Sequence, residues 1–162
     1  MTAIIEAKLH FLDYQVLGLN YEVDSEFQGM AEAPETTLNL KLDVRENVGS
    51  ENHFMLLLEI MLNQSQEDFR RSGFRLATKI GGFFQLDPEL SEQEKANYLL
   101  LNGSSMLYST ARGIVAQIMA QTPFGKQVLP SINMAEFAKD YVERKAAAGK
   151  TKNRKSDKAK PI

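Results

Sequence analysis

The chain has 162 residues, a formal net charge of −2 and no cysteine. This length is typical of one domain, and the lack of cysteine excludes disulfides, thiolate zinc sites and cysteine nucleophiles. No apolar run approaches the roughly 20 residues that cross a bilayer, and residues 1–14 do not have the pattern of a secretory signal, so we expect a cytoplasmic protein.

The first strand is expected over Leu9 to Val23, where apolar and polar residues alternate. The alternation changes phase by one residue near Gly18, as it does at a β-bulge. The segment Ser25 to Glu35 follows as a loop that carries Phe27 and Met30. Exposed apolar side chains of this size are unusual for a mere connector.

Two further strands are expected between Leu38 and Leu62. The first has apolar residues on one face only, namely Leu38, Leu40, Leu42 and Val44. Each contributes about 1.5–3 kcal/mol on burial, so the register is strongly fixed. The second strand, Phe54 to Leu62, is apolar on both faces, and its second face carries Met55, Leu57 and Met61. We expect subunit association or a bound apolar ligand to cover that second face.

A fourth strand is expected from about Phe69 to Phe84, with an inward set of Phe74, Leu76, Thr78 and Ile80. It ends in the sequence Gly81-Gly82-Phe83-Phe84. The two glycines let the strand bend and then present two rings. In the simplest interpretation these rings belong to the core.

The rest of the chain is expected to be helical. Ser91 and Glu94 have the spacing of a capping box, and Asn102-Gly103 is expected to end this short helix. A long amphipathic helix then covers about 105–121. Its apolar face consists of Leu107, Tyr108, Ala111, Ile114, Val115, Ile118 and Met119.

A last helix is expected after Asn133, whose spacing to Glu136 repeats a capping arrangement. It carries Met134, Phe137, Ala138 and Tyr141 and is expected to stop near Gly149. Four antiparallel strands followed by helices that cover one face predict an α+β fold.

The end of the chain differs in charge from the body. Within residues 150–162, six basic residues against Asp157 give +5, which leaves −7 for residues 1–149. We expect one domain over 1–149 and a disordered, solubilising tail over 150–162. Contact of this lysine-rich tail with nucleic acid or an acidic partner is the alternative.

Residues with chemical roles are few. His10 and His53 have no neighbouring ligand in the sequence, and Gly81-Gly82 lacks the spacing of a phosphate-binding loop. Ser104 has no nucleophile elbow around it. We therefore expect no enzyme activity, no metal and no cofactor. Seven methionines, nine phenylalanines and five tyrosines instead favour adaptable apolar contacts with varied partners.

The order of these elements, together with a small set of residues, resembles the preprotein-export chaperone SecB and its relatives over roughly residues 9–145. The set consists of Gly81-Gly82, Tyr108-x-x-Ala111-Arg112, Gln121-Thr122-Pro123-Phe124 and Leu129-Pro130-Ser131-Ile132-Asn133-Met134. The resemblance implies a four-stranded antiparallel sheet with helices, assembled as a dimer of dimers. It also implies an ATP-independent holdase that binds unfolded polypeptides in apolar grooves.

The resemblance also suggests roles for particular residues. The expected client-binding residues are Phe27, Met30, Leu38, Leu40, Phe83, Phe84, Phe124, Met134 and Phe137. The expected interface between subunits consists of Leu107, Ala111, Ile114, Val115, Ile118, Met119, Met55 and Leu57.

The sequence departs from the family on the surface that docks the translocation motor SecA. That surface is acidic in the export chaperone, whereas here Arg75 and Ala77 stand just before Gly81-Gly82, and only Glu22 on the first strand is acidic. A relative that looks after an antitoxin instead of exported proteins is therefore an alternative. A nucleic-acid-binding module acting through the tail and a small-ligand carrier are two further alternatives.

Overall fold

The computed structural model describes residues 6–29, 36–46 and 50–156, with side chains up to residue 147. The elements, in chain order, are β1 (Leu9–Val23), β2 (Leu38–Glu46), β3 (His53–Leu62), α1 (Gln66–Ser72), β4 (Phe74–Leu86), α2 (Glu92–Asn97), the π-helical η1 (Tyr98–Gly103), α3 (Ser104–Ala120) and α4 (Met134–Ser156). Among the described residues, no helix is both long enough and apolar enough to cross a bilayer.

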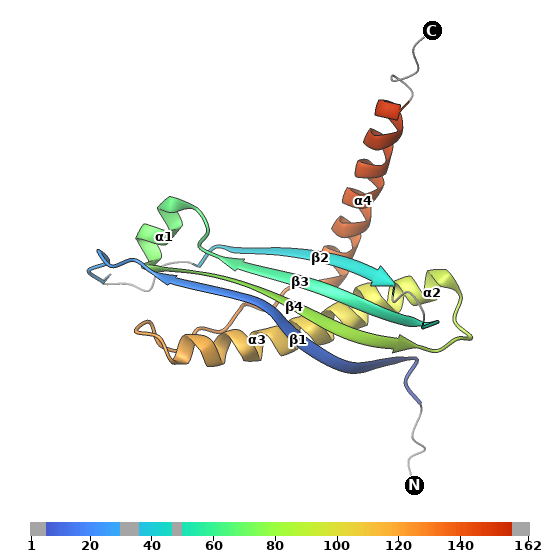
Figure 1. The fold of residues 1–162 in the computed structure, drawn as a ribbon, viewed down its shortest axis with the longest axis horizontal. Helices are drawn as coiled ribbons and strands as arrows, with labels where there is room; N and C mark the ends of the chain where they lie inside the picture. Colours follow the sequence, from blue (N-terminus) through green and yellow to red (C-terminus); the bar gives the residue numbers. More distant parts are fainter. Residues whose placement is uncertain (1–5, 30–35, 47–49, 157–162) are drawn as a thin grey trace.

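The four predicted strands form one antiparallel sheet in the order β1-β4-β3-β2, which makes β1 and β2 its edges. The phase change predicted near Gly18 is confirmed as a register shift between Val16 and Gly18, and a second shift lies between Phe11 and Asp13. The long helix α3 lies along one face of the sheet, and α4 leads away from it (Figure 1).

The core lies between α3 and the facing side of β3 and β4. Its members include Leu56, Leu58, Ile60, Leu62, Phe74, Leu76, Ile80, Phe84, Leu107, Tyr108, Val115 and Met119. The inward set predicted for the fourth strand is thereby confirmed, and Thr78 is buried with it. Gly82 lets α3 approach β4, because a Cβ on it would lie 2.9 Å from Leu107 Cδ1.

The predicted start of the fourth strand is wrong, because α1 occupies Gln66–Ser72 and β4 begins only after Gly73. The Ser65 hydroxyl caps α1 by accepting a hydrogen bond from the Asp68 amide. Gly73 ends the helix with a φ of 77°, in the left-handed region. Phe69, expected in a strand, is therefore a buried helical residue.

The helix break predicted at Asn102-Gly103 is also wrong. The chain stays helical from α2 through η1 into α3, and Gly103 has a helical φ of −60°. This glycine serves packing instead, since a Cβ on it would lie 3.0 Å from Leu56 Cδ1. The capping box predicted for Ser91 and Glu94 is confirmed at the start of α2.

The cap predicted for the last helix is confirmed, because the Asn133 side chain accepts hydrogen bonds from amides in the first turn of α4. The predicted stop near Gly149 is wrong, since the backbone of α4 stays helical to Ser156. Alanine, lysine and arginine favour the helix, and a single glycine costs only about 1 kcal/mol. The predicted tail, 150–162, thus begins inside α4, and residues 157–162 lie outside the described residues.

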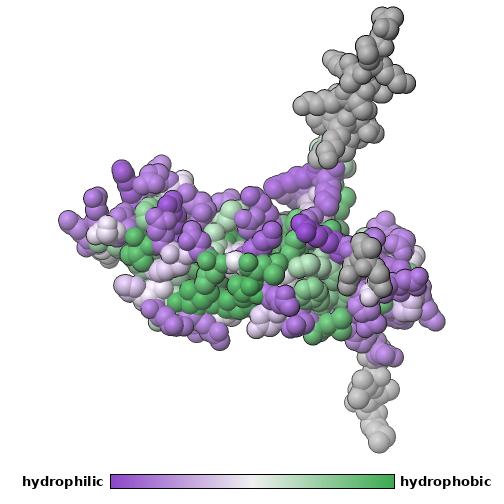
Figure 2. Space-filling model, viewed as in Figure 1, coloured by the Kyte–Doolittle hydropathy of each residue, from purple (hydrophilic) through white to green (hydrophobic). Residues whose placement is uncertain are grey.

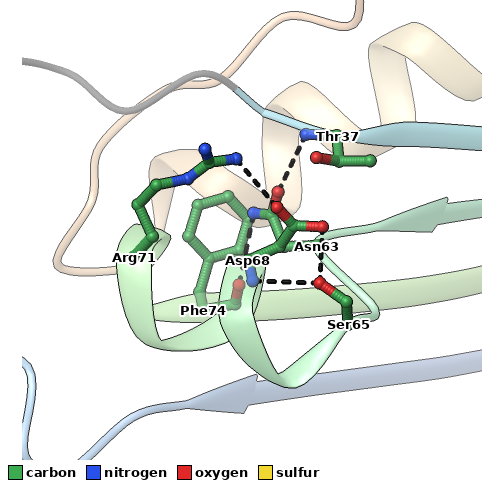
Figure 3. Close-up of polar contacts among 6 residues, drawn as sticks. All are labelled: Thr37, Asn63, Ser65, Asp68, Arg71 and Phe74. Carbon is green, nitrogen blue, oxygen red and sulfur yellow. Dashed lines mark hydrogen bonds and ion pairs between the residues drawn. The ribbon is translucent and has the colours of Figure 1, made fainter.

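A buried asparagine, Asn63, ties three strands together beside α1 (Figure 3). Its side-chain oxygen accepts a hydrogen bond from the Thr37 amide at 3.0 Å, just before β2. Its side-chain nitrogen donates to the Phe74 carbonyl at 3.2 Å, at the start of β4. Asn63 itself follows β3 with a φ of 52°, which asparagine tolerates better than most residues.

Asn63→Ala is expected to lower the free energy of unfolding by about 2–4 kcal/mol, because it leaves a buried amide and carbonyl unpaired at a positive φ. Urea unfolding followed by circular dichroism measures the change. Asn63→Gly removes the same hydrogen bonds without the backbone strain and should be less destabilising. Parent-like stability of Asn63→Ala would contradict this role.

Candidate functional site

A shallow groove lies between the edge strand β2 and α4, with a volume of about 300 Å³. Its lining residues, called the α4 groove below, are Leu40, Lys41, Leu42, Phe137, Asp140, Tyr141, Arg144 and Lys145. The apolar and aromatic members are half-buried and the charged members are exposed. Phe137 and Tyr141 stand one helical turn apart and therefore share a face of α4. The arrangement is an apolar floor with a charged rim.

Ion pairs hold α4 against β2 at this groove. Lys145 Nζ lies 3.6 Å from a carboxylate oxygen of Asp43 on β2, and Arg144 lies 2.6 Å from Asp140. A side-chain hydrogen bond with Tyr141 raises the pKa of Lys145, and Asp43 adds to this effect. Exposed pairs of this kind contribute at most about 1 kcal/mol each, so the rim is held weakly.

The linker between α3 and α4 is fixed by the Tyr108 and Arg112 pair on which the family resemblance rests. The Tyr108 hydroxyl donates to the Pro130 carbonyl at 2.7 Å, and Arg112 Nε donates to the Leu129 carbonyl at 2.9 Å. Burial raises the pKa of Tyr108, so the phenol keeps the proton that it donates. The two bonds set where α4 starts and hence where the groove lies.

Of the predicted client-binding residues, Leu40 and Phe137 come together in the α4 groove. Leu38 and Met134 are half-buried outside its lining. Met30 lies outside the described residues.

Phe27 and Phe124 form a second, separate apolar surface near α1. Their ring centres are 5.7 Å apart, and Phe124 lies 5.1 Å from the Phe74 ring. Gly73 makes room for this contact, because a Cβ on it would lie 2.5 Å from the Phe27 ring. Both rings are half-buried, so the two residues present one apolar surface together.

The two phenylalanines at the end of the fourth strand face opposite sides of the sheet. Phe84 is fully buried beneath α3, so the prediction that it lines a client groove is wrong. Phe83 lies on the other face and is half-buried.

Half of the predicted subunit interface is buried inside the subunit itself. Four of its residues, Leu107, Ala111, Val115 and Met119, are each 0% exposed. The prediction that these four contact another copy is wrong, because the chain's own sheet covers them. An amphipathic pattern identifies a buried face without saying what buries it.

Met55 and Leu57 lie on the sheet face opposite α3. With Leu17 they fill the space above Gly81, where a Cβ would lie 2.6 Å from Met55 Cε. Leu57 is buried and Met55 is half-buried. The chain therefore covers part of this second face of β3 itself, and a subunit contact there stays a prediction.

Exposed apolar side chains gather on the edge strand β1 instead. Tyr14, Val16 and Leu19 are between 44% and 50% exposed. They pair with Gly82, Ile80 and Thr78 of β4. Ile80 and Thr78 are buried, and a Cβ on Gly82 would face Leu107 of α3. Directly paired residues share one face of a sheet. These three side chains therefore lie on the α3 side of the sheet.

Ile114 and Ile118 of α3 extend this exposed surface. They are half-buried, and the helical spacing places them on the flank of α3 away from Arg112, which binds the linker. We call Tyr14, Val16, Leu19, Ile114 and Ile118 the β1–α3 surface. Figure 2 shows hydrophobic residues gathered over the middle of the molecule, where Figure 1 places β1 and α3.

Glu22, the acidic residue considered for motor docking, is paired within the chain. Its carboxylate lies 2.7 Å from Arg75, whose guanidinium also lies 4.7 Å from the centre of the Phe69 ring. The charge of Glu22 is thus largely balanced by Arg75, and docking of SecA there stays a prediction.

Neither histidine belongs to a cluster with metal-binding composition. In the described residues, no group of three or more histidine, cysteine, aspartate or glutamate side chains is close enough to hold a metal ion. His53 Nδ1 lies 2.9 Å from the Glu51 carbonyl oxygen, which accounts for one of its ring nitrogens.

The family of the preprotein translocase subunit SecB matches residues 14–147, from within β1 to within α4. The chain belongs to the SecB family. This membership confirms the resemblance inferred from the sequence and assigns the protein a chaperone role. The SecB family match includes Tyr108, Arg112 and every residue of the α4 groove.

Individual relatives of this SecB-family chain are distant. The uncharacterized protein MJ0357 of Methanocaldococcus jannaschii is 23% identical over 145 residues, 90% of this chain and 92% of that protein. The SecB-like chaperone Rv1957 of Mycobacterium tuberculosis was solved in complex with a ChAD peptide from the antitoxin Rv1956 HigA1. It has a TM-score of 0.62 at 16% identity, covering 78% of this chain and 91% of that chain. A Streptococcus agalactiae protein of unknown function has a TM-score of 0.41 at 12% identity, and the match covers 80% of this chain and 100% of that chain. The likeness to Rv1957 confirms the predicted α+β fold.

Sequence reasoning did not identify most of the α4 groove. Leu42 and Tyr141 were noticed as members of apolar faces but not as parts of a site. Their separation in the chain hides the contact, and only the packing of α4 beside β2 brings them together. The spacing of Tyr141 and Lys145 was the one available signal. Residues four apart lie side by side on a helix, so these two could be expected to share one face of the last helix.

Proposed function

We propose that this SecB-family chaperone is an ATP-independent holdase that binds unfolded polypeptide segments and keeps them from aggregating until transfer. The observation that carries the proposal is the α4 groove, whose half-exposed floor lies beside an open strand edge. One client side chain buried there contributes about 1.5–3 kcal/mol. Several grooves acting on one client raise the effective concentration and hence the affinity.

We also propose that copies of the chain meet through the β1–α3 surface, giving a dimer and then a dimer of dimers. β1 is an edge strand with exposed apolar side chains, and such edges are normally paired or covered. A twofold interface needs one self-complementary patch, and this surface is our candidate for it.

The proposal covers two kinds of client, which are preproteins handed to an export motor such as SecA and an antitoxin. The antitoxin peptide bound to Rv1957 supports short polypeptide segments as clients of this fold. The pairing of Glu22 with Arg75 favours the antitoxin alternative, which does not require an acidic sheet face for motor docking. A cytoplasmic location, the lack of a cofactor and the small role given to nucleic acid stay predictions.

The holdase proposal is tested by the aggregation of a chemically unfolded client diluted into buffer and followed by light scattering. We expect suppression at near-equimolar chaperone, with the same curve in the presence and absence of ATP. An aggregation curve unchanged by excess protein would overturn the proposal.

A further inference from the structure

We propose that the α4 groove selects client segments in which an apolar side chain is flanked by acidic residues. This inference rests on the holdase function proposed above. It deepens that function by naming the chemistry of the segments that bind, which is an aliphatic or aromatic anchor with carboxylates beside it.

The charged side chains that line the α4 groove are mostly cationic. The lining holds three basic residues and one acidic residue, namely Lys41, Arg144, Lys145 and Asp140. The carboxylates of Asp43 and Glu59, which pair with two of these cations, do not belong to the lining. A segment that enters the groove therefore meets more positive than negative charge.

In each ion pair of the lining cations, the cation is the more exposed partner. The side chain of Lys41 is 69% exposed and its carboxylate partner 39%, and the pairs of Arg144 and Lys145 follow the same order. This order is not general in the described residues, because Lys95 is 13% exposed and its carboxylate partner 82%. Exposed pairs contribute at most about 1 kcal/mol each, so a carboxylate of the client can share or replace the partner.

The positive charge continues along α4 beyond the groove. Residues 144–156 contain no acidic residue and six basic ones, namely Arg144, Lys145, Lys150, Lys152, Arg154 and Lys155, and the backbone stays helical to Ser156. The net charge of residues 1–149 is negative, but salt limits the interaction of exposed charges to about 8 Å at physiological ionic strength. The charges at the groove therefore count for more than the net charge of the body.

The apolar floor favours a polypeptide over other polyanions. Leu40, Leu42 and Phe137 line a volume of about 300 Å³ that accepts an aliphatic or aromatic side chain. A nucleic acid supplies phosphates without an aliphatic side chain, whereas an acidic polypeptide supplies both the carboxylates and the anchor. Such a segment complements the floor by its anchor and the rim by its charge.

Three fluorescein-labelled peptides test this selection on the full-length protein. They share a core of leucine and phenylalanine and are flanked on both sides by glutamate, by serine or by lysine. At low salt we expect the glutamate peptide to bind about tenfold more tightly than the lysine peptide, with the serine peptide between them. The difference should shrink severalfold at about 0.5 M salt, because the rim charges are then screened. Fluorescence anisotropy measures each Kd.

The double variant Lys41→Gln, Arg144→Gln assigns the selection to the rim. It removes two of the three cations of the groove and leaves the pair of Lys145 with Asp43 in place. We expect the ratio of the lysine-peptide Kd to the glutamate-peptide Kd to fall about three- to fivefold. A general loss of binding or folding changes both Kd values alike, so it does not imitate a change in their ratio.

The double variant Lys8→Gln, Arg71→Gln is the matched control. Both residues are exposed cations in ion pairs, and neither lines the α4 groove. This variant has the same net charge as the groove variant, so its ratio of Kd values should stay at that of the parent. An equal fall in both variants would overturn the inference, because net charge and not the rim would then select the client.

Each remaining contrary outcome has one meaning. Equal Kd values for the three peptides, or tighter binding of the lysine peptide, would overturn the selection and leave the holdase proposal intact. A labelled single-stranded oligonucleotide that binds more tightly than the glutamate peptide would overturn it in favour of nucleic acid. Failure of the parent protein to bind any of the three peptides would overturn the proposed function itself.

Discussion

The double variant Val16→Asp, Ile118→Asp is expected to split the assembly. Both residues belong to the β1–α3 surface, and Val16 is 46% exposed in the single chain, so the subunit should still fold. A carboxylate trapped between two apolar surfaces without a partner costs several kcal/mol, enough to separate the copies. Four chains of 18.2 kDa give about 73 kDa, and the variant should move toward the mass of one or two chains. Light scattering coupled to size-exclusion chromatography measures the mass.

Val128→Asp is the control for this experiment. Val128 is 56% exposed and lies in the linker, outside the β1–α3 surface. It repeats the valine-to-aspartate change made at position 16, one of the two substitutions in the double variant, and should leave the mass unchanged. A parent-like mass for the double variant would refute the proposed surface, and a parent protein that runs as one chain would remove the assembly proposal altogether.

Phe137→Asp is expected to raise the Kd for an unfolded client by roughly tenfold to a hundredfold, because Phe137 supplies part of the groove floor and burying such a ring contributes about 1.5–3 kcal/mol. Phe137 is half-exposed on α4, so its loss should leave the Tm and the native mass close to those of the parent. Fluorescence anisotropy of a labelled unfolded peptide measures the Kd.

Val142→Asp provides the comparison on the same helix. Val142 is 51% exposed and does not line the α4 groove, so client binding should be preserved. Equal weakening by both variants would mean that any acidic residue on α4 disturbs binding and that the groove is not the site. Intact binding by Phe137→Asp would place the client elsewhere, with the Phe27 and Phe124 surface as the next candidate.

Together these variants separate two surfaces that the sequence alone had merged. The β1–α3 surface should control mass, and the α4 groove should control client affinity. The two lie on opposite edges of the sheet, since β1 and β2 are its outer strands. A variant at one edge should therefore leave the other function intact.

Local patterns predicted much of the fold. The single-faced alternation from Leu38 to Val44 identified β2, and the phase change near Gly18 identified a bulge that the register confirms. The helix caps at Ser91 and Asn133 could also be predicted from the sequence, because a capping side chain hydrogen-bonds to a backbone amide only two or three residues away. In each case the deciding contact lies within a few residues or within one strand.

Local patterns were misread where two structures compete for the same residues. Phe69 was placed in a strand because apolar residues continue into β4, although Ser65 and Gly73 carry the cap signals of α1. Gly103 was assigned to a helix stop because glycine commonly ends helices. Its actual role is to let the helix pass close to Leu56, and that neighbour lies far away in the sequence.

The sequence by itself determined the strands, the amphipathic helix and the excess of apolar side chains that points to binding. The tertiary structure decided which of those side chains remain exposed. Strand order made β1 an edge and left Val16 exposed, while the packing of α3 on β3 and β4 buried Leu107 and Val115. The physical reason is that an apolar side chain is buried equally well by its own sheet or by another copy, and only the path of the chain selects the partner.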